Sequence, residues 1–176
     1  MRILISLRNT VIQNLDENRD SIDKRLIKLI IEIGALPILI PNNFGKSKNK
    51  KKLNNFIKLV KPNGLLLSGG EDLNKNDDRD NLENILISYF LKKNKPIFGI
   101  CRGMQIISKN FRSSLKKTKL RVRKKYKIQS CFDNKFHQAK CYFRWEISKC
   151  PQNFDISFYT RNGTIWGIKH KYKKCE

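Results

Sequence analysis

The ten residues Pro96-Ile97-Phe98-Gly99-Ile100-Cys101-Arg102-Gly103-Met104-Gln105 decide the fold of this chain. Their first half is an apolar run that predicts a buried strand, and from Met104 onward apolar residues recur at helical spacing. Gly99 and Gly103, two residues to either side of Cys101, allow the backbone to crowd the turn between the two elements. The stretch is typical of a nucleophile elbow, and the helix N-terminus is expected to lower the pKa of the Cys101 thiol. A buried cysteine that acts as a small apolar side chain is the alternative.

Strand and helix signals alternate on the N-terminal side of this stretch. Apolar runs predict strands at residues 3–7, 36–40, 65–67 and 96–100. Helical spacing of apolar residues predicts helices within residues 22–33, 53–60 and 82–90 and directly after Cys101. Because the strands are apolar throughout, we expect an α/β fold with a doubly wound, mainly parallel sheet covered on both faces.

From residue 113 onward the helical periodicity fades and short β-like segments replace it. They lie at residues 126–128, 141–147, 156–160 and 164–168. Asn162-Gly163, between the last two segments, predicts a hairpin with a type I′ turn. We therefore expect a single domain over residues 1–176 with a β-rich C-terminal portion.

The charge balance leaves two interpretations open. The 38 Lys and Arg against 15 Asp and Glu give a formal net charge of +23 over 176 residues. Such a charge suits a polyanionic partner, but the chain is also crowded with Lys, Asn and Ile, whose codons are A/T-rich. The lysines are spread along the whole sequence without a nucleic-acid-binding motif, so a nucleic-acid partner is not expected. Hydrophobic residues at 39 % exclude a wholly disordered chain.

The cysteines and the apolar runs bear on location and cofactors. The five cysteines form no C-x-x-C pair, so neither a zinc site nor a disulfide scaffold is expected. No apolar stretch approaches the ~18 residues that cross a bilayer, and the N-terminus does not resemble a secretory leader. We expect a cytoplasmic protein with no membrane partner and no metal or organic cofactor.

A second loop adds to the chemistry of the elbow. Ser68-Gly69-Gly70-Glu71-Asp72 follows the strand predicted at residues 65–67. Ligands of open α/β sheets gather at the carboxyl ends of parallel strands. The paired glycines expose backbone N–H groups that, with the N–H of Arg102, can stabilise an oxyanion. An ordinary strand-to-helix turn is the alternative.

Together the two loops resemble the class I glutamine amidotransferase superfamily. The resemblance is strongest to its branch of γ-glutamyl hydrolases and γ-glutamyl-GABA hydrolase-like proteins, the C26 cysteine peptidases. Residues 67–72 resemble that branch's Gly-Gly-x-Asp loop, and residues 96–105 resemble its nucleophile motif. Residues 17–23 and 163–171 also resemble family segments, so the resemblance extends nearly from end to end.

The resemblance implies a flavodoxin-like sheet and cysteine-dependent attack on the side-chain amide of glutamine or of a γ-glutamyl compound. Cys101 would be the nucleophile, and the N–H groups of Gly70 and Arg102 would form the oxyanion hole. The same resemblance assigns substrate contacts to Gly69, Glu71, Gln105 and His137. It implies a small-molecule substrate and no cofactor, and it allows a synthetase or acceptor-enzyme partner.

One part of the family pattern is missing. The family completes its catalytic triad with a His and a Glu in a Trp-His-Pro-Glu-like motif, whereas no His-x-Glu occurs here before Glu176. Neither His137 nor His170 stands where the family has its general base. The expectation is a C-terminally truncated domain whose glutaminase or γ-glutamyl amide hydrolase activity is impaired. The alternatives are a non-catalytic family member that acts by binding and, least favoured, a basic nucleic-acid-binding protein.

Overall fold

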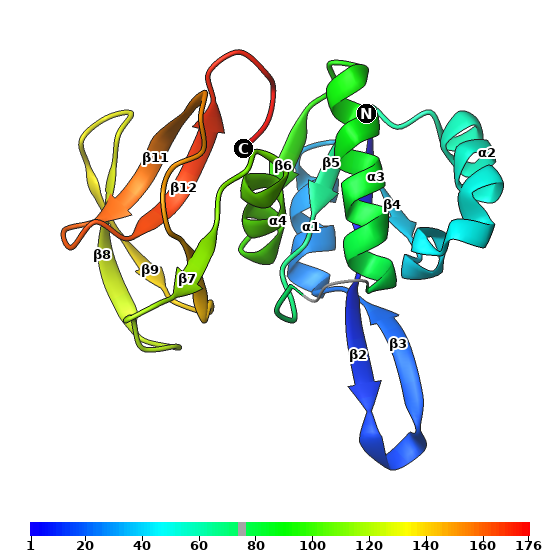
Figure 1. The fold of residues 1–176 in the computed structure, drawn as a ribbon, viewed down its shortest axis with the longest axis horizontal. Coiled ribbons are helices and arrows are strands. Elements are labelled where there is room, and N and C mark those ends of the chain that lie inside the picture. Colours follow the sequence, from blue (N-terminus) through cyan, green and yellow to red (C-terminus); the bar gives the residue numbers. More distant parts are fainter. Residues whose placement is uncertain (74–76) are drawn as a thin grey trace.

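A computed structural model describes residues 1–73 and 77–176, and a four-stranded parallel sheet lies at its centre (Figure 1). The strands lie in the order β4-β1-β5-β6 and comprise β1 (Arg2–Ser6), β4 (Leu36–Ile40), β5 (Gly64–Leu67) and β6 (Ile97–Gly99). Counted along the chain this is the order 2-1-3-4, which places a topological switch point between β1 and β5. The expected α/β fold with a mainly parallel sheet is confirmed.

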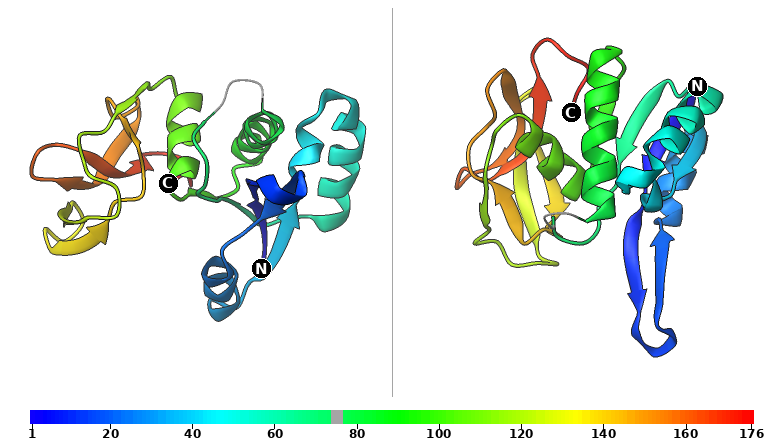
Figure 2. Two further views of the ribbon diagram at one scale, coloured as in Figure 1. Left: turned by 90° about the horizontal axis from the view of Figure 1, so that it is seen from below. Right: turned by 45° about the vertical axis from the view of Figure 1, so that its right-hand side comes forward.

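Helices lie on both faces of the sheet (Figures 1 and 2). On one face, α1 (Lys24–Glu32) buries Ile30 against Ile5 and Leu66. The other face and its large core belong to α2 (Lys50–Val60), α3 (Asp78–Lys92) and α4 (Arg102–Asn110). Part of the polar loop expected before α3, residues 74–76, lies outside the described residues.

Helix α1 covers only the middle of its face. Leu39, Ile5, Leu66 and Phe98 are neighbours in register across the sheet, so they point to the same side. Ile5 and Leu66 are buried beneath α1, whereas Leu39 and Phe98 remain 42 % and 49 % exposed. A groove of about 710 Å³ lies over β5 and β6, between α1 and the chain near Lys171. The expectation that both faces are covered is therefore correct only in part.

A hairpin that was not predicted leaves the sheet directly after β1. Its strands β2 (Arg8–Ile12) and β3 (Glu17–Ser21) pair antiparallel and project away from the sheet (Figure 1). The hairpin lacks a buried face, so its sequence lacks the alternation that marks a strand. At its base the Asn42 Nδ2 group donates to Asp20 Oδ1 at 2.6 Å and to Asn9 Oδ1 at 2.9 Å. These bonds tie the hairpin to the loop that follows β4.

The C-terminal portion is built from antiparallel strands, as expected. A four-stranded sheet has the order β12-β11-β8-β9, from β8 (Lys125–Ser130), β9 (Phe136–Lys140), β11 (Phe154–Thr160) and β12 (Ile165–His170). A separate pair joins β7 (Leu115–Lys117) to β10 (Trp145–Ile147). The strand predicted at residues 141–147 shrinks to β10, and β9 was missed because it is almost wholly exposed. In Figure 1, α4 lies between this portion and the parallel sheet.

The hairpin predicted at Asn162-Gly163 forms, but the predicted type I′ turn was wrong. A type I′ turn needs positive φ at both central residues, and only Gly163 has one, at +81°. The Gly163 N–H donates to Thr160 O at 2.8 Å, and the Thr160 N–H donates to Thr164 O at 3.0 Å. The loop is therefore three residues long and ends on a left-handed glycine, the usual alternative to the two-residue turn.

The last residues return to the parallel sheet. Cys175 lies beside Ile97 in a parallel bridge, and the Gly99 N–H donates to Glu176 O at 2.7 Å. The Glu176 N–H donates in turn to Ile97 O at 3.0 Å. Residues 174–176 thus extend the sheet beyond β6, and Cys175 is fully buried there.

Candidate active site

The elbow expected at Cys101 is present. Cys101 has φ 54° and ψ −103°, a backbone conformation that a non-glycine residue adopts only under local strain. The turn also brings backbones into direct contact. A Cβ on Gly99 would lie 2.5 Å from the carbonyl carbon of Gly103, and a Cβ on Gly103 would lie 2.2 Å from Leu67 O. Two glycines are therefore required for α4 to begin this close to β5 and β6.

The electrostatic surroundings of Cys101 differ from the expectation. Burial raises the pKa of the Cys101 thiol above its ordinary value, and this outweighs the opposing effect of the Arg102 backbone N–H. The helix N-terminus, which favours the thiolate, is visible in the sequence, whereas the desolvation of a partly buried sulfur is not. In the resting protein, Cys101 is held as a neutral thiol more firmly than an exposed cysteine would be.

The two loops predicted to act together do meet. A Cβ on Gly69 would lie 3.6 Å from the Cβ of Cys101, so the loop after β5 passes directly beside the nucleophile elbow. Gly70 has φ +148°, and a Cβ there would lie 2.7 Å from an Arg79 guanidinium nitrogen and 2.9 Å from the Cβ of Arg8. Glycine is the residue that can adopt this conformation in such a confined position.

A cavity of about 870 Å³ opens above the two loops. Its floor is the elbow at Cys101 with the segment 68–71, and its walls come from β2 and from the chain at the start of α1. Tyr142, from the C-terminal portion, completes the lining. Gly69, Gly70, Glu71 and Cys101 all contribute, so four of the predicted site residues share one cavity. A volume of this size suits a small-molecule ligand.

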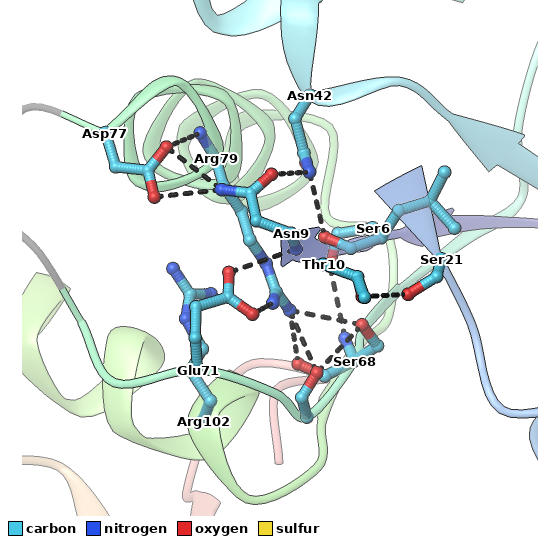
Figure 3. Close-up of polar contacts among 12 residues, drawn as sticks. Ser6, Asn9, Thr10, Ser21, Asn42, Ser68, Glu71, Asp77, Arg79 and Arg102 are labelled. Carbon is cyan, nitrogen blue, oxygen red and sulfur yellow. Dashed lines mark hydrogen bonds and ion pairs between the residues drawn. The ribbon is translucent and has the colours of Figure 1, made fainter. Parts of the chain in front are cut away.

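A buried charge cluster that the sequence analysis missed supports the floor of this cavity (Figure 3). The Arg79 guanidinium, which is wholly buried, donates to Ser68 O at 2.8 Å and to Gly69 O at 3.2 Å. It also pairs with Glu71 at 2.8 Å and with Glu83 at 3.0 Å. One side chain on α3 therefore holds the carbonyl groups of the segment that borders Cys101.

The same cluster reaches the elbow from the other side. Arg102 follows the predicted nucleophile, and its buried guanidinium pairs with Glu83 and Asp80. Burial raises the pKa of Asp80 to about 6, against the pull of Arg102 in the other direction. Glu83 lies between the two arginines and so couples Arg79 to Arg102. The i, i+4 spacing of Arg79 and Glu83 was the available signal, but such pairs usually lie on a solvated helix face.

Two predicted substrate-contact residues lie elsewhere. The Gln105 side chain is buried and donates from Nε2 to Trp145 O at 2.7 Å, which ties α4 to β10. His137 is exposed on β9, where its ring packs at 6.2 Å from the ring of Phe158. The structure brings neither side chain into the cavity that Cys101 lines.

His170, the other histidine of the chain, does not line the Cys101 cavity either. It is buried, and its Nδ1 atom accepts hydrogen bonds from the backbone N–H groups of Tyr172 and Lys173, each at 3.1 Å. Burial lowers the pKa of the imidazole. This histidine therefore orders the turn after β12.

The described ranges 1–73 and 77–176 lack two further kinds of feature. No group of three or more His, Cys, Asp or Glu side chains is arranged there to hold a metal ion. No helix in those ranges has the length and apolar character needed to span a membrane.

The fold and the elbow define an α/β protein with a strained cysteine at the carboxyl edge of its parallel sheet, beside a glycine-rich loop. The class I glutamine amidotransferase family matches residues 14–176, so this chain belongs to that family.

Three known proteins show how far the likeness extends. A glutamine amidotransferase-like protein of Rickettsia prowazekii is 31 % identical over 101 residues, which are 49 % of this chain and 33 % of that protein. The gamma-glutamyl-CDP-amidate hydrolase of Campylobacter jejuni is 28 % identical over 118 residues, which are 62 % of this chain and 56 % of that protein. A crystal structure from Thermoplasma acidophilum, whose name refers to GMP synthase, has a TM-score of 0.69 at 22 % identity, covering 99 % of this chain and 81 % of its own. The chain spans about a third of the length of the curated relatives that it matches first.

Proposed function

We propose that this chain hydrolyses the side-chain amide of glutamine or of a γ-glutamyl compound through Cys101. The observation that carries the proposal is the position of Cys101. It lies on a strained elbow at the floor of an 870 Å³ cavity, directly beside Gly69. Membership of the class I glutamine amidotransferase family supports the reaction type.

The chemistry follows from a thiol in this place. Cys101 loses its proton, and the sulfur attacks the amide carbon, so that the C–N bond breaks and a glutamyl thioester forms. The departing nitrogen takes up a proton and leaves as ammonia or an amine. Water then attacks the thioester, which releases glutamate and returns the proton to the sulfur. We assign the stabilisation of the oxyanion to the backbone N–H groups of Gly70 and Arg102.

No histidine among the described residues stands beside Cys101 as an acid–base partner. The chain has two histidines, and neither His137 nor His170 lies at the Cys101 cavity. Burial also raises the pKa of the Cys101 thiol, which disfavours the thiolate. We therefore propose that residues 1–176 by themselves turn over slowly, without the family's His-Glu pair. The same observations favour a second candidate, a family member that binds γ-glutamyl compounds without hydrolysing them.

We place the chain in the γ-glutamyl hydrolase-like, C26 branch of the family. Support comes from Glu71-Asp72 directly after the glycine pair, and from a relative whose name describes the hydrolysis of a γ-glutamyl amidate. Other relatives are named as parts of a glutamine-hydrolysing GMP synthase, so a synthetase or acceptor-enzyme partner belongs to the proposal.

Covalent labelling tests the proposed function. The purified chain is treated with the glutamine analogue 6-diazo-5-oxo-L-norleucine, and the modified residue is found by peptide mass spectrometry. We expect slow labelling of Cys101 that glutamine or a γ-glutamyl amide blocks. Cys101→Ser should abolish the adduct, and Cys131→Ser, at an exposed cysteine, should leave it unchanged.

The outcomes separate the parts of the proposal. Fast labelling that glutamine blocks would contradict the slow turnover while keeping the substrate class. Slow labelling that glutamine blocks, with no release of ammonia from glutamine, would favour the binding-only candidate. Labelling that no γ-glutamyl compound blocks would overturn the substrate class.

A further inference from the structure

The cavity above Cys101 contains a positive charge that the proposed reaction does not use. Arg8, the first residue of β2, lines the cavity and is partly buried. Its Cβ lies 2.9 Å from the place that a Cβ on Gly70 would occupy, so the arginine stands directly against the predicted oxyanion loop.

The other charges at this cavity are already paired. Arg25 binds Asp23 through both carboxylate oxygens, with Nη2 at 2.6 Å from Oδ2 and Nε at 3.1 Å from Oδ1. This pairing, with a smaller contribution from Arg8, lowers the pKa of Asp23 to about 2. Glu71 pairs with Arg79 at 2.8 Å. Within residues 1–73 and 77–176, no carboxylate forms a direct ion pair with Arg8, although its charge also acts on Asp23 from a longer distance.

Hydrogen bonds hold the start of the strand that carries Arg8. Next to it, the Asn9 backbone N–H donates to Glu71 Oε1 at 3.4 Å, and the Asn9 side chain donates to Asp77 at 3.0 Å. The hydroxyls of Thr10 and Ser21 lie 2.6 Å apart across the hairpin (Figure 3). The backbone that carries Arg8 is therefore in place before a ligand binds, which lowers part of the cost of binding.

We propose that Arg8 and the base of the β2–β3 hairpin form an anion-binding subsite of the Cys101 cavity, which takes a carboxylate or phosphate group of the amide substrate. This inference rests on the proposed function, because it assigns one more contact of the same substrate. A partly buried arginine that forms no direct ion pair among the described residues can donate charge-assisted, directional hydrogen bonds to such a group. The anion could belong to the glutamyl part of the substrate or to its amine part, and the test distinguishes the two.

The test measures how ligands protect Cys101 from alkylation by iodoacetamide. The ligands are L-glutamine, γ-glutamylethylamide, whose amine part is neutral, and γ-glutamyl-O-phosphoethanolamine, whose amine part carries a phosphate. The variants are Arg8→Met, Arg8→Lys and the control Arg19→Met. Arg19 lies on the same hairpin, is exposed and pairs with Glu17, and it does not line this cavity. Circular dichroism confirms that each variant is folded.

We expect Arg8→Met to raise the half-protecting concentration of an anionic ligand about tenfold or more, the factor for a lost charge-assisted hydrogen bond. Arg8→Lys should recover part of the loss, and Arg19→Met should change it by less than about twofold. If only the phosphorylated amide loses affinity, the anion lies on the amine part. If all three ligands lose affinity alike, the subsite binds the glutamyl carboxylate.

The remaining outcomes separate a failure of the subsite from a failure of the proposed function. Equal protection in Arg8→Met and Arg19→Met for every ligand would overturn the subsite while the proposed function stands. If no γ-glutamyl ligand protects Cys101 but inorganic pyrophosphate does so in an Arg8-dependent way, the subsite stands and the proposed function fails. If neither kind of ligand protects, both fail.

Discussion

At the scale of single residues, the site depends on a cluster of charges whose centre is buried. Arg79 and Arg102 are buried together with Glu83, and Glu71 and Asp80 extend the cluster at its edges. Each charge is costly to bury alone, and the cluster is stable because every guanidinium meets carboxylates. Since Arg79 binds the carbonyls beside Gly69, the same pairing that stabilises α3 also positions the loop next to Cys101.

Glu83→Gln should therefore be strongly destabilising. The change removes the carboxylate that Arg79 and Arg102 share and leaves two buried cations short of a partner. We expect the free energy of unfolding in urea to fall by about 3–5 kcal/mol. Glu17→Gln, which breaks the exposed pair with Arg19, should cost no more than about 1 kcal/mol. A similar loss of unfolding free energy in both variants would show that the buried cluster contributes little to stability.

The raised pKa of Cys101 predicts a shifted alkylation profile. Only the thiolate reacts with iodoacetamide, and burial favours the neutral thiol, so the reaction at neutral pH should be slow. As pH rises, the rate should increase with a midpoint above that of the same cysteine in the urea-unfolded chain. Peptide mass spectrometry at a series of pH values gives both midpoints. A folded-state midpoint at or below the unfolded one would contradict the raised pKa.

At the scale of elements, the elbow sets the distance between α4 and β5. Gly103 lies in a helix, where alanine would ordinarily be preferred. A Cβ at this position would nevertheless lie 2.2 Å from Leu67 O, which is backbone and cannot turn aside. The requirement for glycine is tertiary, because it comes from the neighbouring strand.

Gly103→Ala should consequently prevent α4 from docking. We expect a loss of at least about 3 kcal/mol in unfolding free energy, or a failure to fold, from overpacking against a fixed backbone. Gly163→Ala is the matched control, since nothing lies within 4 Å of its Cβ position and only the positive φ is strained. That variant should cost about 1–2 kcal/mol. Equal losses would mean that the contact with Leu67 relaxes easily.

The elements that the sequence did not predict share one property. β2, β3, β7 and β9 have no continuous buried face, so their pairing leaves no apolar alternation in the sequence. The parallel strands were predicted because their apolar runs are buried, as in β5, whose four residues are all covered. Of the predicted site, Gly69, Gly70, Glu71 and Cys101 come together because their loops follow adjacent parallel strands.

At the scale of the whole molecule, the excess of basic residues opposes compactness. A formal net charge of +23 remains after all 15 Asp and Glu are counted against the 38 Lys and Arg, and it is spread over both the parallel sheet and the β-rich portion. Like charges at the surface repel one another, and dissolved salt screens them within about 10 Å at 0.1 M.

The stability of the chain should therefore rise with salt. Between about 0.02 and 0.5 M sodium chloride, we expect the thermal unfolding midpoint to increase, because screening removes repulsion from the folded state. Differential scanning fluorimetry in a pH 7 buffer measures it. Sodium sulfate at matched ionic strength is a control, since a much larger effect of sulfate would indicate specific anion binding or salting-out. A midpoint that falls with sodium chloride would show that attractive ion pairs dominate.

Features that depend on residues close together in the sequence could be predicted. Features that depend on residues far apart in the sequence could not. The strand, elbow and helix around Cys101 could be predicted from apolar periodicity and from Gly99, which meets the backbone of Gly103 within the same turn, whereas the contact of Gly103 with Leu67 O is tertiary. The neutral state of the Cys101 thiol, the buried cluster of Arg79, Glu83 and Arg102, and the position of Arg8 beside Gly70 depend on residues distant along the chain. These features arise from desolvation and charge pairing. Both effects depend on the folded chain, because only the fold excludes water and sets the neighbours of each group.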